Sequence, residues 1–210
     1  MSNGVAYPVL RTPDFALALS TARRLMEFGR CEHSKVSVFA EFHSVAEARR
    51  VAKELPEGWF RGQEGYLEFN GVPLEEQPGL VVGVQGPGLP ADPAAYEGRL
   101  PMECELYDLP VGSIEDAFTA AVGANMGWIN WESLCWPDAP EVGFRGESKH
   151  AEVTLLFNSR TRELDECVDD HTVLVHVRSA SVDRRQMREP YAHWLAAQVG
   201  LEVIGAGQRN

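Results

Sequence analysis

The sequence predicts an α+β fold with a mixed or antiparallel sheet, because three strand–helix–strand units follow one another along the chain. These units cover residues 35–62, 102–131 and 172–205. In each unit, residues that alternate between apolar and polar, as in a strand, adjoin a segment with the apolar spacing of an amphipathic helix. The order of elements fits two tandem ferredoxin-like βαββαβ halves, and it also fits a single larger α+β sheet.

The first elements are a helix, a strand and a second helix. Thr12 is the expected N-cap of the first helix, and Gly29 is its expected end. The alternating run Lys35–Phe42 predicts a strand. Directly after it, Ser44 and Glu47 have the spacing of a capping box, so the second helix begins there.

Short extended runs dominate the next part of the chain. Trp59–Gly62 and Gly65–Phe69 predict a hairpin or two adjacent strands, and Leu80–Val84 predicts a further strand between Gly- and Pro-rich loops. A short helix at residues 91–98 and a strand at Met102–Leu106 are expected to follow.

The remaining elements alternate in the same way. Ser113 is the expected N-cap of a helix that ends near Gly123 or Gly127. The last third of the chain is expected to hold, in order, a strand Glu152–Phe157, a loop Asn158–Asp170, a strand Thr172–Arg178, a helix Asp183–Val199 and a strand Leu201–Gly205.

The domain organisation follows from this order. We expect an N-terminal helical segment at 1–34, a first α+β half at 35–110 and a second half at 111–210. The break is expected in the Pro- and Gly-rich stretch 86–101, or after residues 110–112. One continuous domain is the alternative.

Composition indicates an ordinary globular protein. Of the 210 residues, 44% are hydrophobic and 24% are charged, which is enough apolar side chain for a core. The N-terminus has no basic segment followed by an apolar one, and no run approaches the roughly 18 apolar residues that span a bilayer. We therefore expect a cytoplasmic protein that makes no membrane contact.

The net charge of −12 is concentrated in the middle of the chain. Residues 61–143 carry 2 basic and 14 acidic side chains, whereas residues 1–60 and 144–210 have net charges of +1 and −1. Such a segment repels phosphate backbones, so direct binding of nucleic acid is not expected. It could attract a basic protein partner, or it could simply keep the protein soluble.

The four cysteines show no CxxC spacing, and we expect reduced, mostly buried thiols. The sequence Cys31-Glu32-His33 could form a thiolate–imidazole pair, but so short a motif also arises by chance. The acidic residues between Asp165 and His171 lack the spacing of a calcium-binding loop. We therefore predict neither a metal site nor a cofactor.

Three of the five tryptophans lie between residues 128 and 136, next to acidic side chains. Such a cluster either fills the core or forms an aromatic surface that binds cations by cation–π contact. The residues expected to bind a partner are Trp128, Trp131, Trp136, Glu132, Asp138, Glu103 and Glu105.

The histidines supply an alternative polar site. His171 and His176 flank one predicted strand five residues apart, so they lie on opposite faces and cannot bind one ion together. His176 shares its face with Arg178, and the alternative site consists of His171, His176 and Arg178. An exposed structural role for His176 is the other interpretation.

The strand–capped-helix–strand layout of residues 35–70 and the closing sequence VGLEVIGAG resemble small acidic bacterial proteins that inhibit endoribonuclease E. The resemblance is confined to the hydrophobic pattern of these two stretches, so no family is assigned from it.

We hypothesise a non-catalytic acidic protein that docks on a basic protein and inhibits or sequesters it. This hypothesis accounts for the charge distribution and for the lack of a recognisable catalytic motif. The alternatives are a small hydrolase or transferase, or a small-molecule binding module, that uses a cleft between the two halves. The sequence leaves the oligomeric state open.

Overall fold

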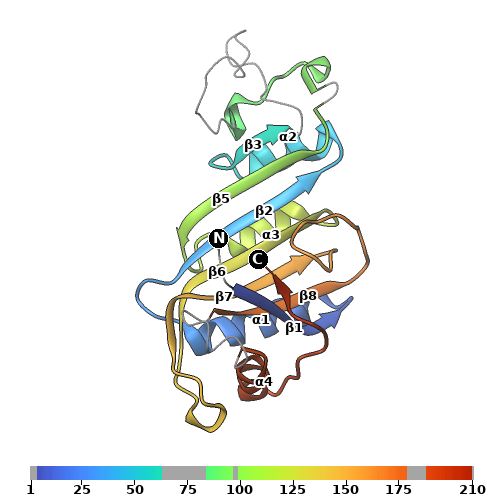
Figure 1. Cartoon of the computed structure of the whole chain (residues 1–210). Helices are drawn as coiled ribbons and strands as arrows, with labels where there is room; N and C mark the ends of the chain where they lie inside the picture. The colour runs from blue at the N-terminus through green and yellow to red at the C-terminus, as the bar shows by residue number, and fades with distance from the viewer. Residues whose placement is uncertain (1–3, 63–83, 97–98, 179–187, 210) are drawn as a thin grey trace. The chain divides into compact units, whose positions relative to one another are not determined.

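The computed structural model describes residues 4–62, 84–96, 99–178 and 188–209, and within them it has four α-helices and nine strands (Figure 1). The strand pairs with a described register are antiparallel. This composition confirms the predicted α+β class.

The chain divides into two compact units. Unit 1 combines residues 1–37 with residues 128–210, and unit 2 is the stretch 38–127 between them. Unit 2 is therefore an insertion within unit 1. The predicted tandem halves are not confirmed, since unit 1 is assembled from two separate stretches of chain.

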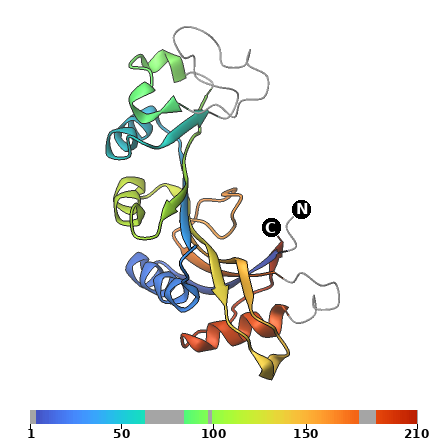
Figure 2. The same cartoon turned by 90° about the vertical axis from the view of Figure 1, so that its left-hand side faces the viewer.

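Unit 1 contains five strands in the order β6-β7-β8-β1-β9. Its elements are β1 (Gly4–Thr12), α1 (Phe15–Gly29), the greater part of β6 (Met126–Trp136), β7 (Glu147–Phe157), β8 (His171–Arg178), α4 (Arg188–Gln198) and β9 (Gln208–Arg209). Figure 2 shows α1 and α4 on the same side of these strands.

The register of unit 1 fixes which side chains face the helices. His176 of β8 pairs with Ala6 of β1 and with Glu152 of β7, so the three residues share one face. Val175 pairs with Tyr7 and Val153 on the other face, which α1 and α4 cover. The strand period of two therefore separates an apolar face under the helices from a face that includes polar residues.

Unit 2 has the strand order β4-β3-β5-β2, with the first residues of β6 beside β2. Its elements are β2 (Lys35–Phe42, from residue 38), α2 (Val45–Glu54), β3 (Trp59–Gly62), β4 (Val84–Gln85), the 3-10 turns η2 (Gly86–Gly88) and η3 (Pro93–Tyr96), β5 (Met102–Pro110) and α3 (Glu115–Val122). Both α2 and α3 lie on one side of these strands (Figure 2).

The capping box predicted for α2 is confirmed. The backbone N–H of Glu47 donates to Ser44 Oγ at 3.2 Å, and Ser44 Oγ donates to the Glu47 carboxylate at 2.8 Å. Inside α2, Ala48 and Val51 are fully buried, as the apolar spacing of the sequence predicted.

Two predicted N-caps are wrong. Thr12 ends β1, where it pairs with His171, and Asp14 caps α1 by accepting from the Leu17 N–H at 3.0 Å. Ser113 instead donates to the Pro110 carbonyl oxygen. At α3, the first turn is stabilised by the Glu115 carboxylate, which accepts from backbone N–H groups of the preceding turn.

The ends of the chain also differ from the prediction. The segment 1–34 is not purely helical, because β1 precedes α1 and pairs with β8. Leu201–Gly205 is not a strand, and the last strand is β9 at 208–209. The strand expected at Gly65–Phe69, most of Leu80–Val84 and the start of the helix expected at 183 lie outside the described residues.

The strands predicted at Lys35–Phe42 and Trp59–Gly62 are confirmed with the same bounds, and those predicted at 102–106, 152–157 and 172–178 with longer ones. β5 continues to Pro110, and β7 begins at Glu147. Gly29 ends α1 as predicted, and it also has a packing role, since a Cβ at this position would lie 2.6 Å from the Trp136 ring. Within the described part of the chain, none of the helices is long and apolar enough to cross a bilayer.

Candidate functional site

The face of unit 2 opposite α2 and α3 carries a group of charged and aromatic side chains. Alternation along the strands places Phe60 and Cys104 in the core and their neighbours on this face. We call it the open face and define it by Glu41 of β2, Trp59 and Arg61 of β3, and Glu103, Glu105 and Tyr107 of β5.

Arg61 is the centre of the open face. It pairs across the strands with Glu103, and its Nε forms an ion pair with that carboxylate. Its Nη2 lies 3.4 Å from Glu105 Oε2, which also accepts a hydrogen bond from Tyr107 Oη at 2.8 Å. One guanidinium is thus held between two carboxylates, next to an aromatic ring.

Two aromatic side chains of the open face are exposed. Trp59 is 45% exposed and Tyr107 is 52% exposed. Trp59 pairs directly with Glu105 across β3 and β5. Large exposed aromatic rings next to charged groups are typical of protein-binding surfaces, because a ring contributes contact area at a small entropic cost.

The electrostatics of the open face are dominated by its carboxylates. Partial burial, the hydrogen bond to Glu105 and the negative charge of Glu105 raise the pKa of Tyr107 to about 12. Burial and the nearby charge of Glu103 raise the pKa of Glu41, although His43 opposes this shift. The residues that define the open face include three carboxylates and one guanidinium, and the third carboxylate, that of Glu41, lies 3.0 Å from His43 Nε2.

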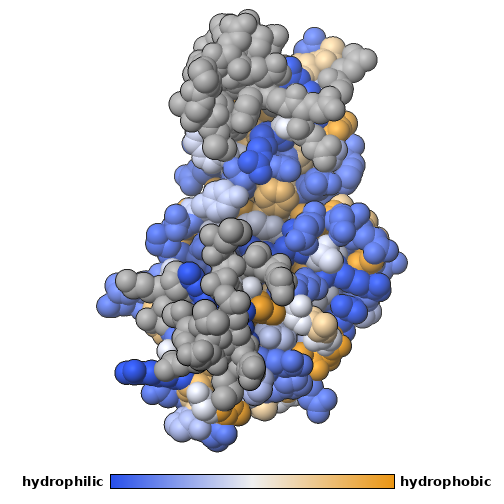
Figure 3. All heavy atoms as spheres, in the orientation of Figure 1, coloured by the Kyte–Doolittle hydropathy of each residue, from blue (hydrophilic) through white to orange (hydrophobic). Residues whose placement is uncertain are grey.

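Unit 2 as a whole is acidic. Residues 38–127 carry 5 basic and 15 acidic side chains, a net charge of −10, and unit 1 carries the remaining −2. In Figure 3, which views the strands from the side away from the helices, hydrophilic side chains predominate and hydrophobic ones form separate small areas. The charge recognised in the sequence therefore belongs mainly to one unit.

The structure places the residues predicted to bind a partner in different environments. Glu103 and Glu105 belong to the open face, where Glu105 is only 9% exposed because it is engaged by Arg61 and Tyr107. Trp131 and Trp136 are buried in unit 1 and present no surface to a partner. Trp136 Nε1 donates to the His176 carbonyl oxygen at 2.8 Å, so this tryptophan is a packing residue with a satisfied N–H.

The other three lie near the surface of unit 1. Trp128 is partly buried, and the Arg162 guanidinium lies 5.8 Å from the centre of its ring. Glu132 accepts a hydrogen bond from Ser37, and Asp138 accepts one from the Gly146 N–H. The cation–π contact predicted for this tryptophan cluster thus exists at Trp128, but its cation belongs to the same chain.

The alternative histidine site is also divided. His171 lies on the helix side of β8, with its ring 5.2 Å from the ring of Phe15. His176 is buried on the opposite face, as the spacing predicted. The backbone N–H of Arg178 donates to Glu147 at 2.9 Å. The three residues therefore do not form one site.

His176 belongs to a cluster that we call the buried polar cluster and define as Asn130, Glu152, Thr154, Arg162 and His176; the side chains of Glu152 and Arg162, at its edge, are 25% and 29% exposed. Thr154 Oγ1 lies 2.8 Å from His176 Nε2 and donates to Asn130 Oδ1 at 2.7 Å. The amide nitrogen of Asn130 donates to Glu152 at 3.2 Å. Glu152 lies 3.8 Å from His176 Nδ1 and 4.0 Å from Arg162.

Chemically, the buried polar cluster resembles a satisfied core network more than a catalytic site. Burial and the positive charge of Arg162 lower the pKa of His176 to about 3, so the imidazole is neutral at physiological pH. Burial raises the pKa of Glu152 despite the hydrogen bond from Asn130. His176 is fully buried, which keeps its nitrogens from a substrate in solution.

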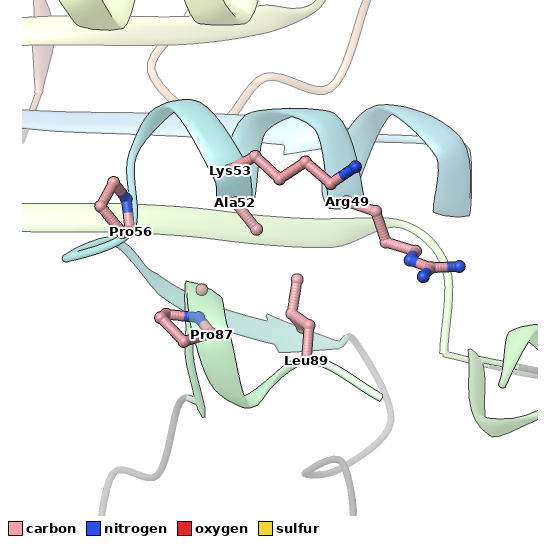
Figure 4. Close-up of a pocket in the computed structure, with 7 residues that line it drawn as sticks. Arg49, Ala52, Lys53, Pro56, Pro87 and Leu89 are labelled. Atoms are coloured by element: carbon pink, nitrogen blue, oxygen red, sulfur yellow. The ribbon is translucent and has the colours of Figure 1, made fainter. Parts of the chain in front are cut away.

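A pocket of about 320 Å³ lies on the helix side of unit 2 (Figure 4). It is formed by α2 and the segment that follows β4, with an apolar lining of Ala52, Pro56, Pro87 and Leu89. The charged residues that line it are Arg49 and Lys53. It is separate from the open face.

The cysteines differ from the prediction of mostly buried thiols. Cys104 is buried, Cys31 and Cys135 are partly buried, and Cys167 is exposed. The imidazole of His33 pairs with Glu32 at 3.1 Å. The thiol of Cys31 instead has Cys135 as its neighbour, a contact that sequence reasoning missed.

Sequence reasoning also missed Trp59, Arg61 and Tyr107. Their signal is the period of two, since Trp59 and Arg61 flank the buried Phe60, and Tyr107 continues the alternation of Glu103 and Glu105.

Metal binding is not indicated in the described ranges, where no three His, Cys, Asp or Glu side chains are grouped to hold an ion. Comparison with models of protein families, with curated proteins and with solved structures finds no match.

Proposed function

We propose that this protein is a non-catalytic binding protein that uses the open face of unit 2 to dock on a basic protein, which it inhibits or sequesters. The observation that carries this proposal is the combination of two exposed aromatic rings, Trp59 and Tyr107, with the carboxylates of Glu41, Glu103 and Glu105 on one sheet face.

The contacts of Arg61 support the proposal that this face binds a cation of the partner. Its guanidinium binds two carboxylates and lies beside the Tyr107 hydroxyl. An arginine or lysine of a partner would find the same acceptors, together with Trp59 as an aromatic surface. Because Arg61 engages both Glu103 and Glu105, one guanidinium neutralises only part of their charge, and the face retains negative charge for a partner to neutralise.

The charge of unit 2 supports the same proposal at longer range. A net charge of −10 on one unit creates a potential that attracts basic surfaces before contact and accelerates association at low ionic strength. Binding is therefore expected to weaken steeply as salt is added.

We further infer that each unit is a ferredoxin-like βαββαβ fold and that one is nested within the other. In unit 1, β1-α1-β7-β8-α4-β9 has the strand order β9-β1-β8-β7. The elements of unit 2, taken together with β6, whose greater part belongs to unit 1, give β2-α2-β3-β5-α3-β6 in the equivalent order β6-β2-β5-β3. This arrangement covers one sheet face with two helices and leaves the other face for binding.

The test is capture of partners on the immobilised full chain at about 0.1 M and about 0.5 M salt, where the Debye length falls from roughly 10 Å to roughly 4 Å. The face variant carries Glu103→Gln and Glu105→Gln. The matched control carries Glu57→Gln and Asp116→Asn, which remove the same charge from exposed positions of unit 2 outside the open face.

We expect the parent and the control variant to retain the same basic protein at the lower salt and to release it at the higher salt. The face variant should retain at most a tenth as much. Equal retention by the face variant and the control variant would show that the open face is not the docking site. Circular dichroism of each variant checks that the fold is preserved.

A further inference from the structure

We propose that Cys31 and Cys135 form a reactive dithiol site that low-molecular-weight disulfides oxidise to an intramolecular disulfide. Cys31 lies in the turn between α1 and β2, and Cys135 lies near the end of β6. Both side chains are partly exposed and belong to unit 1, so a small oxidant can reach them.

A network of short contacts holds the Cys31 turn against β6. Cys31 Sγ lies 3.2 Å from the Ser133 carbonyl oxygen, two residues before Cys135. Ser34 Oγ donates to Cys31 Sγ at 3.6 Å, and it also accepts from the Cys31 N–H at 2.9 Å. Each of these two thiols perturbs the ionisation of the other, which places Cys135 beside Cys31.

These contacts make the two sulfurs chemically unequal. Burial opposes ionisation of Cys31, but hydrogen bonds from Cys135, from Ser34 and from nearby backbone N–H groups outweigh it and lower the pKa of Cys31. The hydrogen bond to Cys31, followed by burial, raises the pKa of Cys135. Cys31 is therefore the nucleophile, and Cys135 is the thiol that resolves the intermediate.

The reaction balances with a small disulfide as the oxidant. The Cys31 thiolate attacks one sulfur of the disulfide, which forms a mixed disulfide on Cys31 and releases one small thiolate. That thiolate can take the proton of Cys135, whose sulfur then attacks Cys31 Sγ and expels the second small thiolate. The second small thiolate takes up the proton that Cys31 released when it ionised. The two cysteines thus lose two electrons and two protons, and the oxidant is reduced to two small thiols.

The two other cysteines provide internal comparisons. Burial and the neighbouring charge of Glu105 raise the pKa of Cys104 to about 12, so this thiol is expected to be inert. Cys167 is exposed but lies in the 158–170 loop, where no second cysteine is near in sequence. We expect Cys167 to stop at a mixed disulfide with the oxidant.

The position of the disulfide gives it a structural consequence. Residues 31 and 135 flank the inserted unit 2 on both sides, since that unit spans residues 38–127. The bond would therefore close a covalent loop around the whole insertion. Such a long loop restricts the unfolded chain strongly, so oxidation is expected to raise the unfolding temperature.

The experiment treats the reduced full chain with oxidised glutathione and follows products by intact mass and by peptide mapping. A Cys167→Ser background keeps the exposed thiol from contributing. We expect a product that lacks two hydrogen atoms and contains a peptide linking Cys31 to Cys135. Adding Cys135→Ser should arrest the reaction with glutathione on Cys31, and adding Cys31→Ser should slow the reaction of Cys135 at least tenfold.

Two outcomes would overturn the proposal. One is a stable mixed disulfide on Cys31 in the chain that retains Cys135, because it would mean that Cys135 cannot resolve it. The other is reaction of Cys31 no faster than that of Cys167 in the parent chain. Denatured chain treated in the same way shows which linkages require the fold.

Discussion

On the sheet face opposite the helices, unit 1 buries polar residues, whereas unit 2 exposes charged and aromatic ones. In unit 1 this face contains the buried polar cluster, where Thr154 and His176 are almost completely covered. In unit 2 the corresponding face is the open face, where Trp59 and Tyr107 are about half exposed. The two units thus have similar layouts of strands and helices, but this face has a packing role in unit 1 and is available for contact in unit 2.

The difference arises from the segments that cover the face in unit 1. Arg162, in the loop between β7 and β8, lies against Trp128 and Glu152. Removing water from this face makes each hydrogen bond of the cluster costly to lose.

The largest expected effect is on the buried polar cluster. Thr154→Val removes the hydroxyl that bonds to Asn130 and His176 and leaves two buried polar groups without that partner. We expect the free energy of unfolding to fall by about 1–3 kcal/mol. Urea unfolding followed by tryptophan fluorescence measures it, since four of the five tryptophans belong to unit 1.

Thr119→Val is the matched control for this substitution. Thr119 lies in α3 of unit 2, and its hydroxyl donates to a backbone carbonyl at an exposed position. We expect a change within about 0.5 kcal/mol. If Thr154→Val and Thr119→Val lower the free energy of unfolding by the same amount, the hydrogen bonds of the buried polar cluster do not stabilise the fold as proposed.

The pH dependence of the free energy of unfolding should also distinguish the contributions of His176 and Glu147, two titratable groups of unit 1. His176 has a folded pKa of about 3, below its ordinary 6.5, so the unfolded chain binds a proton that the folded chain does not, and stability falls as the pH falls through this range. Burial raises the pKa of Glu147 to about 7 from 4.5, so this group has the opposite effect between pH 7 and 4.5.

The two effects oppose each other above pH 4.5, and only that of His176 remains between pH 4.5 and 3. In the His176→Asn variant, the free energy of unfolding should therefore fall less steeply as the pH is lowered below 4.5. Glu147→Gln should make the loss begin near pH 6.5. Urea midpoints at several pH values measure both slopes, and unchanged slopes would contradict the assignment of these groups.

The smallest expected effect on stability concerns Arg61 of the open face. Arg61→Gln removes a partly exposed ion pair, which is worth less than about 1 kcal/mol. It also removes the cation that competes with a partner, so retention of the basic partner at low salt should increase. Reduced retention would mean that Arg61 itself binds the partner.

Local signals in the sequence predicted most elements correctly. The capping box of Ser44 and Glu47 and the alternation of Lys35–Phe42 depend on neighbouring residues alone. β1 was missed because Pro8 interrupts its pattern and because its partner β8 is far away in sequence. Thr12 does not cap α1 because it pairs with His171 and belongs to β1.

The candidate site was only partly predictable for the same reason. The concentration of charge identified Glu103 and Glu105 because composition can be counted along the chain. Arg61 joins them only through the pairing of β3 with β5, and Cys135 meets Cys31 only through the packing of a turn on β6. Contacts between distant segments depend on the topology. The sequence pattern predicted two tandem halves, whereas unit 2 is inserted within unit 1.

The pairing of Gly4 with Arg178 has a consequence for the order in which the protein folds. During synthesis, all of unit 2 emerges from the ribosome before β7 and β8 exist, so the insertion can fold first. Until β7 and β8 have been synthesised, β1 has no strand to pair with, and the apolar side of α1, which includes Ala18, Ala22 and Leu25, has no sheet to pack against. The N-terminal segment is therefore the part of the nascent chain that is most exposed to aggregation and to binding by chaperones.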